Sequence, residues 1–349
     1  MRGQVFLLAI AFLAVARPLT ADEWDAPLKR YRELAAKAPR DRKADETEEM
    51  LRLGDRLYRW AKRNEENPRT TEILWTLCEG RPLGAQAAGA IQLLLTRDLH
   101  SPRWASLCGP IADADWSDGG GLGTDAILTR LKAESAQEIV WAAAQWHLAR
   151  RELAAAAKVD PLDIKEVAAR QQSALVRLRE LAAARTPLLL EGVDFRDLAK
   201  GRLDLLQRNA LGARAPEVAG QDLHGEPLSL LSYRGKIVVL IFWGAWCPIC
   251  REQFPAEKAL AEKVTDKPVV LLGVNSDMER SVALKMAKEE GLHWPSYWDE
   301  GSTRGPIARQ WGVEGWPTVI LLDHRGVIRY RFPGMPGVDK AVEILLKEL

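Results

Sequence analysis

Two cysteines separated by two residues form the most chemically informative motif in the sequence. Cys247 and Cys250 follow an apolar run at 237–243 and come just before a helical pattern at 251–264. Cysteines three positions apart lie one helical turn from each other, which is close enough for a disulfide. A sulfur at a helix N-terminus meets free N–H groups and the positive end of the helix dipole, which lowers the pKa of its thiol. We therefore predict that Cys247 attacks a partner disulfide and that Cys250 resolves the mixed disulfide.

Three other roles are open to this cysteine pair, and the surrounding residues bear on each. A zinc site would need two further ligands, and Cys78 and Cys108 lie in another part of the chain at a different spacing. A structural disulfide is disfavoured, because a turn from strand to helix needs no covalent link. A thiol peroxidase would carry threonine or serine three residues before the attacking cysteine and proline seven before it, where Gly244 and Leu240 stand. No metal site is expected.

The elements around the pair predict an α/β domain. Apolar, β-rich runs alternate with helical patterns, in the chain order 237–243, 251–264, 268–274, 278–290, 318–322 and 338–349. Strands buried on both faces and separated by helices are typical of a central sheet covered by helices. The run at 327–332 follows 318–322 after a short turn and predicts an antiparallel hairpin.

The preceding part of the chain, residues 22–208, has helical periodicity throughout. At 45–63, for example, apolar residues recur at steps of three and four with charges between them. An all-α domain is predicted, either a helical bundle or a helical array of the tetratricopeptide type. The array is suggested by a short repeat: Leu77-Cys78 recurs as Leu107-Cys108 thirty residues later, each time after a tryptophan. We call this repeat the internal echo.

This internal echo also leads to a prediction about the other two cysteines. If the echo reflects stacked helix pairs, Cys78 and Cys108 end two neighbouring helices and could form a structural disulfide. The alternative is that both are free thiols in the core, since cysteine packs well as a small apolar side chain.

The N-terminus predicts export. A basic start is followed by twelve apolar residues at 5–16 with small residues near the end of the run, as in a secretory signal peptide that is cleaved after Ala16 or Ala21. The alternative is an uncleaved membrane anchor, although twelve helical residues span only about 18 Å of a hydrocarbon core of roughly 30 Å. Export to the periplasm or cell envelope would place the cysteines in a compartment that permits disulfides. With a net charge of +1 over 349 residues, the chain has no basic surplus for nucleic acid.

Further motifs accompany the cysteine pair in a fixed order. They lie at 212–216 with 222–225, at 242–250, at Pro255 and at 311–318. With these motifs, residues 212–349 resemble the TlpA/ResA-like thiol–disulfide oxidoreductases of the thioredoxin superfamily, in the redoxin (AhpC/TSA) group. The resemblance implies a thioredoxin-like domain over 209–349, exchange with protein thiols and disulfides, and no cofactor beyond the redox-active disulfide.

The resemblance also implies a substrate site. The family has a cis-proline that faces the disulfide, and it maps to Pro317. The backbone of Trp316 is then expected to pair with an extended substrate segment. Trp246, Pro248 and Ile249 complete the expected substrate-binding set.

Two positions depart from the family pattern. Six residues before the first cysteine, where relatives carry an acid or asparagine, the chain has Ile241. Three residues after the second cysteine, where many relatives carry a glutamate that assists proton transfer, it has Gln253, with Glu252 beside it as a candidate accessory group. The direction of electron flow is therefore left open.

Three functions follow from these observations. The first is an exported thiol–disulfide oxidoreductase that acts on protein substrates and an unidentified electron-transfer partner, with the helical domain providing protein contacts. The second is a partner-binding scaffold whose thioredoxin-like domain turns over slowly. The third is a peroxiredoxin-like thiol peroxidase, which the residues before Cys247 disfavour.

Overall fold

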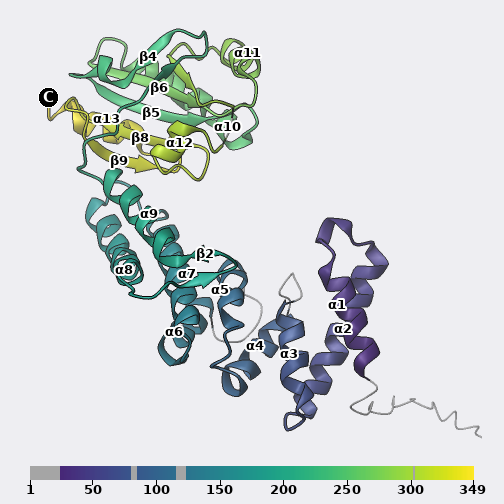
Figure 1. Cartoon of the computed structure of the whole chain (residues 1–349). Helices are drawn as coiled ribbons and strands as arrows, with labels where there is room; N and C mark the ends of the chain where they lie inside the picture. The colour runs from purple at the N-terminus through teal and green to yellow at the C-terminus, as the bar shows by residue number, and fades with distance from the viewer. Residues whose placement is uncertain (1–23, 80–84, 115–122, 302) are drawn as a thin grey trace, which may run out of the picture. The chain divides into compact units, whose positions relative to one another are not determined.

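The chain forms two compact units, one up to Trp141 and one from Ala142 to the C-terminus. A computed structural model describes residues 24–79, 85–114, 123–301 and 303–349 (Figure 1). The predicted signal peptide at 1–21 lies outside the described residues. Within the described ranges, no helix has the length and apolar character needed to cross a membrane. The division after Trp141 lies well before the boundary at 208 that the sequence predicts.

The first unit is helical in its described residues. Its helices are α1 (Asp25–Ala36), α2 (Ala44–Arg63), α3 (Arg69–Glu79), α4 (Ala85–Arg97), α5 (Trp104–Asp113) and α6 (Thr124–Glu134), with a short 3-10 turn at Pro39–Asp41. In α2, the buried Met50, Leu57 and Trp60 share one face at helical spacing, as the sequence predicts. Helices that follow each other in the chain pack together, among them α1 with α2 and α3 with α4. The tetratricopeptide-like arrangement stays a prediction.

The two tryptophans of the internal echo meet in the core of this unit. The rings of Trp75 and Trp104 lie edge to face with centroids 4.9 Å apart. Both indole N–H groups donate to Asp98, that of Trp75 to the carboxylate at 2.7 Å and that of Trp104 to the backbone carbonyl at 2.9 Å. Buried indoles need such partners, so Asp98 links the two halves of the echo.

The predicted disulfide between Cys78 and Cys108 is not formed, because both cysteines are free and buried. Cys78 lies in the last turn of α3, where its thiol points to the carbonyl oxygen of Ala87 in α4 at 3.9 Å. Cys108 lies in the middle of α5, so the two sulfurs do not occupy matching helix ends. Each packs as a small apolar side chain, which was the alternative.

The second unit begins with three helices. These are α7 (Glu138–Ala156), which starts just before the division, α8 (Ile164–Ala182) and α9 (Phe195–Arg208). A two-residue hairpin of β1 (Leu189–Leu190) and β2 (Val193–Asp194) lies between α8 and α9, so the predicted all-α segment contains a small β element. Asp194 ends this hairpin and caps α9 by accepting the Arg196 backbone N–H at 2.9 Å.

A five-stranded sheet forms the centre of the thioredoxin-like part. The strand order is β7 (Ser296–Trp298), β6 (Val269–Asn275), β5 (Ile237–Trp243), β8 (Thr318–Leu322) and β9 (Ile328–Phe332). β5 pairs in parallel with β6 and antiparallel with β8, and β8 with β9 forms the predicted hairpin. The remaining elements are β3 (Ala219–Gln221), β4 (Pro227–Ser229), a 3-10 turn at Leu230–Tyr233, α10 (Pro248–Lys263), α11 (Arg280–Glu290), α12 (Pro306–Gln310) and α13 (Val338–Leu346).

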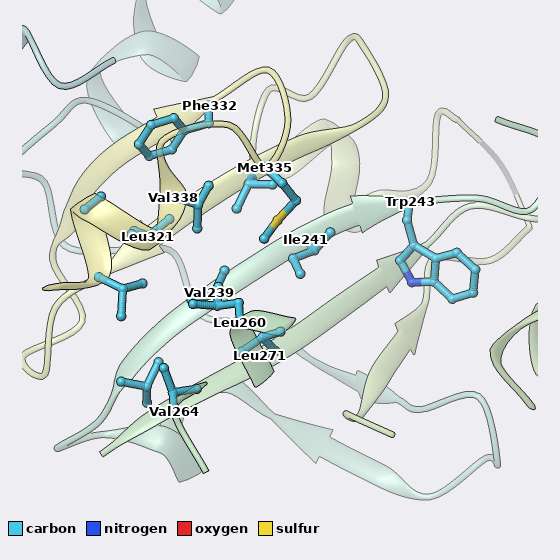
Figure 2. Close-up of a cluster of buried hydrophobic side chains, with 14 of the residues drawn as sticks. Val239, Ile241, Trp243, Leu260, Val264, Leu271, Leu321, Phe332, Met335 and Val338 are labelled. Atoms are coloured by element: carbon cyan, nitrogen blue, oxygen red, sulfur yellow. The ribbon is translucent and has the colours of Figure 1, made fainter. Parts of the chain in front are cut away.

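Alternation along the strands divides the core between the two faces of the sheet. All seven residues of β5 are buried, as expected for a central strand with both faces covered. Ile241 and Trp243 point to the face that α10 and α13 cover, which Figure 2 shows. Leu240 and Phe242 point to the opposite face, which α12 covers. The strand that leads into the cysteine motif is therefore fixed from both sides.

Candidate active site at the Cys247–Cys250 disulfide

The cysteine pair lies where β5 ends and α10 begins. Cys247 is the N-cap of α10, and Pro248 takes the first helical position, where its missing N–H costs nothing. A disulfide joins Cys247 to Cys250 across 5.3 Å between their Cα atoms. The backbone N–H of Cys250 donates to the sulfur of Cys247 at 3.2 Å. After reduction, this N–H and the helix dipole favour the thiolate form of Cys247.

The two sulfurs differ in their surroundings, although both residues are buried. Cys247 retains 3% of its surface and Cys250 none. Trp243 and Phe254 pack edge to face behind the pair, with ring centroids 5.7 Å apart. Cys250 therefore faces the apolar core, and Cys247 lies at the free end of the helix. This is the asymmetry expected of an attacking and a resolving cysteine.

Exposed apolar side chains surround the disulfide. Trp246 is 48% exposed and Ile249 is 55% exposed, whereas Pro317 is buried. The Trp316–Pro317 peptide bond is cis, as predicted. Trp316 packs against the same core cluster as the two cysteines, and its ring lies 5.9 Å from that of Trp246. Trp246 and Trp316 thus meet near the disulfide, Pro248 and Ile249 are exposed between the two cysteines, and Pro317 is the buried residue after Trp316.

A buried acid that the sequence analysis missed holds the turn before Cys247. Asp277 follows β6, and its two carboxylate oxygens accept the backbone N–H of Ala245 at 3.0 and 2.9 Å. The N–H of Trp246 points to the same carboxylate at 3.4 Å, and the side-chain amide of Asn275 donates to it at 2.6 Å. Only tertiary structure brings this residue to the active-site turn, so the local sequence gave no signal.

The residues at the two departures from the family pattern have other roles. Ile241 is fully buried in the apolar core. Gln253 accepts the backbone N–H of Met335 through its side-chain oxygen at 2.7 Å, which ties α10 to the segment before α13. Glu252 is exposed on the outer side of the helix. None of these three is a buried carboxyl next to Cys250.

α10 carries a second buried acid that the sequence analysis missed. Glu257 is 1% exposed, and within the described part of the chain its Oε1 atom has no hydrogen-bond partner. Burial raises the pKa of this carboxyl to about 8. Cys250, Phe254 and Glu257 follow each other at helical spacing on the buried face, and that pattern could have identified it.

A CxxC disulfide at the N-terminus of a helix, next to a cis-proline in a thioredoxin-like fold, defines a thiol–disulfide exchange domain. The AhpC/TSA family matches residues 211–331. The thiol-disulfide oxidoreductase ResA of Bacillus cereus (strain ATCC 10987 / NRS 248) is 30% identical over 161 residues, which cover 46% of this chain and 91% of the relative. ResA of Geobacillus thermodenitrificans (strain NG80-2) is 32% identical over 120 residues, which cover 34% of this chain and 67% of the relative.

Solved structures of similar domains include the thioredoxin domain of a thiol-disulfide oxidoreductase from Bacteroides vulgatus. It is 27% identical, with a TM-score of 0.37, and the match covers 39% of this chain and 98% of that domain. A putative thiol:disulfide interchange protein DsbE from Chlorobium tepidum is 28% identical, with a TM-score of 0.36. The match covers 40% of this chain and 96% of that protein.

From its similarity to the ResA proteins, the chain belongs to the AhpC/TSA family and is a thiol–disulfide oxidoreductase of the ResA type. The resemblance drawn from its motifs is thereby confirmed. None of these relatives is named as a scaffold or a peroxidase, so neither alternative gains support.

Proposed function

We propose that the protein exchanges the Cys247–Cys250 pair with cysteines of protein substrates and that Cys247 attacks first. The observation that carries this assignment is the position of Cys247 as N-cap of α10, where its sulfur accepts the Cys250 N–H at 3.2 Å. Cys250 has no exposed surface, and its sulfur is bonded to that of Cys247.

Exchange proceeds in two steps that move two electrons. In the reducing direction, the Cys247 thiolate attacks a substrate disulfide, whose S–S bond breaks and releases one substrate thiolate. Cys250 then loses its proton and attacks the Cys247 sulfur, which breaks the mixed disulfide and frees the second substrate thiolate. The pair is now oxidised and the substrate carries two thiols. The oxidising direction runs through the same steps in reverse, and a second redox partner restores the starting state.

The second step needs an acceptor for the Cys250 proton. Glu257 lies seven residues further along α10, about 10 Å along the helix axis, which is beyond hydrogen-bond distance. Ile241 cannot accept a proton, and the Gln253 amide is a poor base. Water or the leaving substrate thiolate therefore takes the proton, so resolution is expected to be slow compared with the attack.

Substrate recognition follows from the apolar surroundings of the disulfide. An extended segment of the substrate pairs with the backbone of Trp316, as in β-strand addition, which brings its cysteine to Cys247. Trp246, Ile249 and Trp316 then contact the side chains that flank this cysteine. Exposed apolar residues at this position favour substrates whose cysteine has apolar neighbours.

Trapping experiments test the assignment. Cys250→Ala should accumulate mixed disulfides with protein substrates that carry a disulfide, because the Cys247 thiolate attacks that bond but no second cysteine resolves the product. Cys247→Ala should form none, and the unchanged protein should reduce insulin with a dithiol as electron donor. Trapping by Cys247→Ala, but not by Cys250→Ala, would contradict the proposed order.

Export is part of the proposal and is supported by the basic start, the apolar run at 5–16 and the small residues near the end of that run. N-terminal sequencing of the mature protein should find a start near residue 17 or 22. A retained N-terminus in a membrane fraction would favour the anchor instead.

A further inference from the structure

α9 contacts the segment that leads into the cis-proline. The guanidinium of Arg202 forms an ion pair with the carboxylate of Glu314. One turn later, Leu205 packs against Gly312, where a Cβ atom would lie 3.1 Å from the leucine Cδ2 atom. At the end of the helix, the side-chain amide of Asn209 donates to the carbonyl of Gln310 at 3.0 Å. Two residues of α9 and its C-cap, Asn209, therefore hold the segment that runs from the end of α12 toward β8.

The same segment is held from the sheet by a second arginine. Arg331 in β9 donates to the carbonyl oxygen of Trp311 at 3.0 Å and to that of Gly312 at 2.8 Å. Burial, and to a smaller extent the positive charge of Arg202, lower the pKa of Arg331 to about 10, while Glu314 opposes this. Arg331 therefore stays charged at neutral pH, and the negative charge of Glu314 offsets part of the positive charge of the two guanidinium groups.

The contact between Leu205 and the segment requires glycine at position 312. Its φ is +60°, in the left-handed region that favours glycine, and the leucine at its Cα leaves little room for a side chain. α9 and the segment at 310–316 are thus matched in both charge and shape. α9 precedes the residues that the family model covers, 211–331.

We propose that α9 positions the substrate-binding backbone of Trp316, with Arg202 acting through Glu314 as a positioning residue. Glu314 lies two residues before Trp316, so a segment released from α9 would let the Trp316 backbone move relative to Cys247. Small disulfides need only the Cys247 sulfur, whereas protein substrates also need the Trp316 edge. This inference rests on the proposed exchange with protein substrates.

The test compares two substrates in the full-length protein. With Arg202→Ala, kcat/KM for insulin should fall about fivefold, mainly through KM, which is what a partly exposed ion pair can supply. The rate of the reduced protein with dithiobis-nitrobenzoate, a small disulfide, should stay within twofold. Arg208→Ala is the matched control, because Arg208 lies on the same helix and pairs within it, with Asp204. Arg202→Lys, which keeps the charge, should retain most of the insulin activity.

A second pair of variants keeps the proposal falsifiable if one variant folds poorly. Glu314→Gln should reproduce the effect of Arg202→Ala, and the double variant should be no worse than either single one, since both remove one interaction. Additive losses, equal losses with both substrates, or no loss with insulin would overturn the role of the pair. An unchanged protein that reacts with the small disulfide but not with insulin would refute the proposed function itself.

Discussion

The carboxylate of Asp277 accepts the backbone N–H of Ala245 with both of its oxygens, at 3.0 and 2.9 Å. Asp277 itself is only 3% exposed, and its backbone N–H is held by the side chain of Asn275 at 3.0 Å. A buried carboxylate in a region of low dielectric thus contacts the backbone of Ala245, two residues before the attacking cysteine. Its negative charge opposes the helix dipole that favours the Cys247 thiolate.

Asp277→Asn should lower the pKa of Cys247 in the reduced protein. Asparagine has nearly the same size and keeps one oxygen that can accept the Ala245 N–H, but it removes the negative charge near the sulfur. The thiolate is then easier to form, so alkylation by iodoacetamide should reach half its maximal rate at a lower pH. A more stable thiolate also favours the reduced state, so the reduction potential should become less negative.

Asp323→Asn is the matched control for this prediction. Asp323 is equally buried and accepts the backbone N–H groups of Arg325 and Val327 in the turn between β8 and β9, at the opposite end of β8 from Pro317. It should reduce stability without moving the alkylation profile. If both variants shift the profile alike, or neither does, the charge of Asp277 does not tune Cys247.

The sequence predicts the parts of this site that local pattern encodes. The apolar run at 237–243, the cysteine spacing and the helical pattern after it define a strand, a turn and a helix, and the structure has all three. Pro317 is identified by the residues around it, and its peptide bond is cis. These features depend on residues close in sequence, so periodicity and motif are sufficient.

Contacts between distant segments could not be predicted in the same way. Asp277 reaches Ala245 only because β5 and β6 are parallel neighbours whose ends meet at one edge of the sheet. Arg202 pairs with Glu314 although more than a hundred residues separate them in the sequence. The thirty-residue echo, by contrast, suggested a symmetry between Cys78 and Cys108 that the helices do not have.

Glu257 should make stability depend on pH. Its pKa is raised to about 8 from an ordinary value of 4.5, so the folded protein holds the proton that the unfolded chain releases. The stability from this group is fully present below pH 4.5 and is lost as the pH rises through about 8. In the unchanged protein, the unfolding free energy should therefore decline by several kcal/mol as the pH rises from 4.5 to about 8. Glu257→Gln should remove this decline, because glutamine does not titrate.

Urea unfolding at pH 5 and at pH 9 measures this effect. The difference between the two pH values should be smaller in Glu257→Gln than in the unchanged protein. Glu252→Gln, on the exposed side of the same helix, should leave the difference unchanged. An identical pH dependence in all three proteins would mean that Glu257 is solvated and ionised in the folded state.

Cys78 and Cys108 should be unreactive in the folded, oxidised protein. Burial raises the pKa of both thiols, that of Cys108 to about 12, so little thiolate is present at neutral pH and the sulfurs are inaccessible. Mass spectrometry after alkylation without reduction should find no modified thiol in the native protein and two after unfolding in urea. Absence of modification after unfolding would instead reveal a disulfide between them.

Gln253→Glu should accelerate the resolving step. Gln253 lies one turn after Cys250 on α10 and already accepts the Met335 N–H, a bond that a carboxylate can keep. The added carboxylate would supply the proton acceptor that is absent from this position and from Ile241. Release of a fluorescent substrate from a preformed mixed disulfide at Cys247 should become several-fold faster near neutral pH, with little change in the rate of the initial attack. Glu252→Gln is the control, and an unchanged release rate in Gln253→Glu would show that proton removal from Cys250 does not limit resolution.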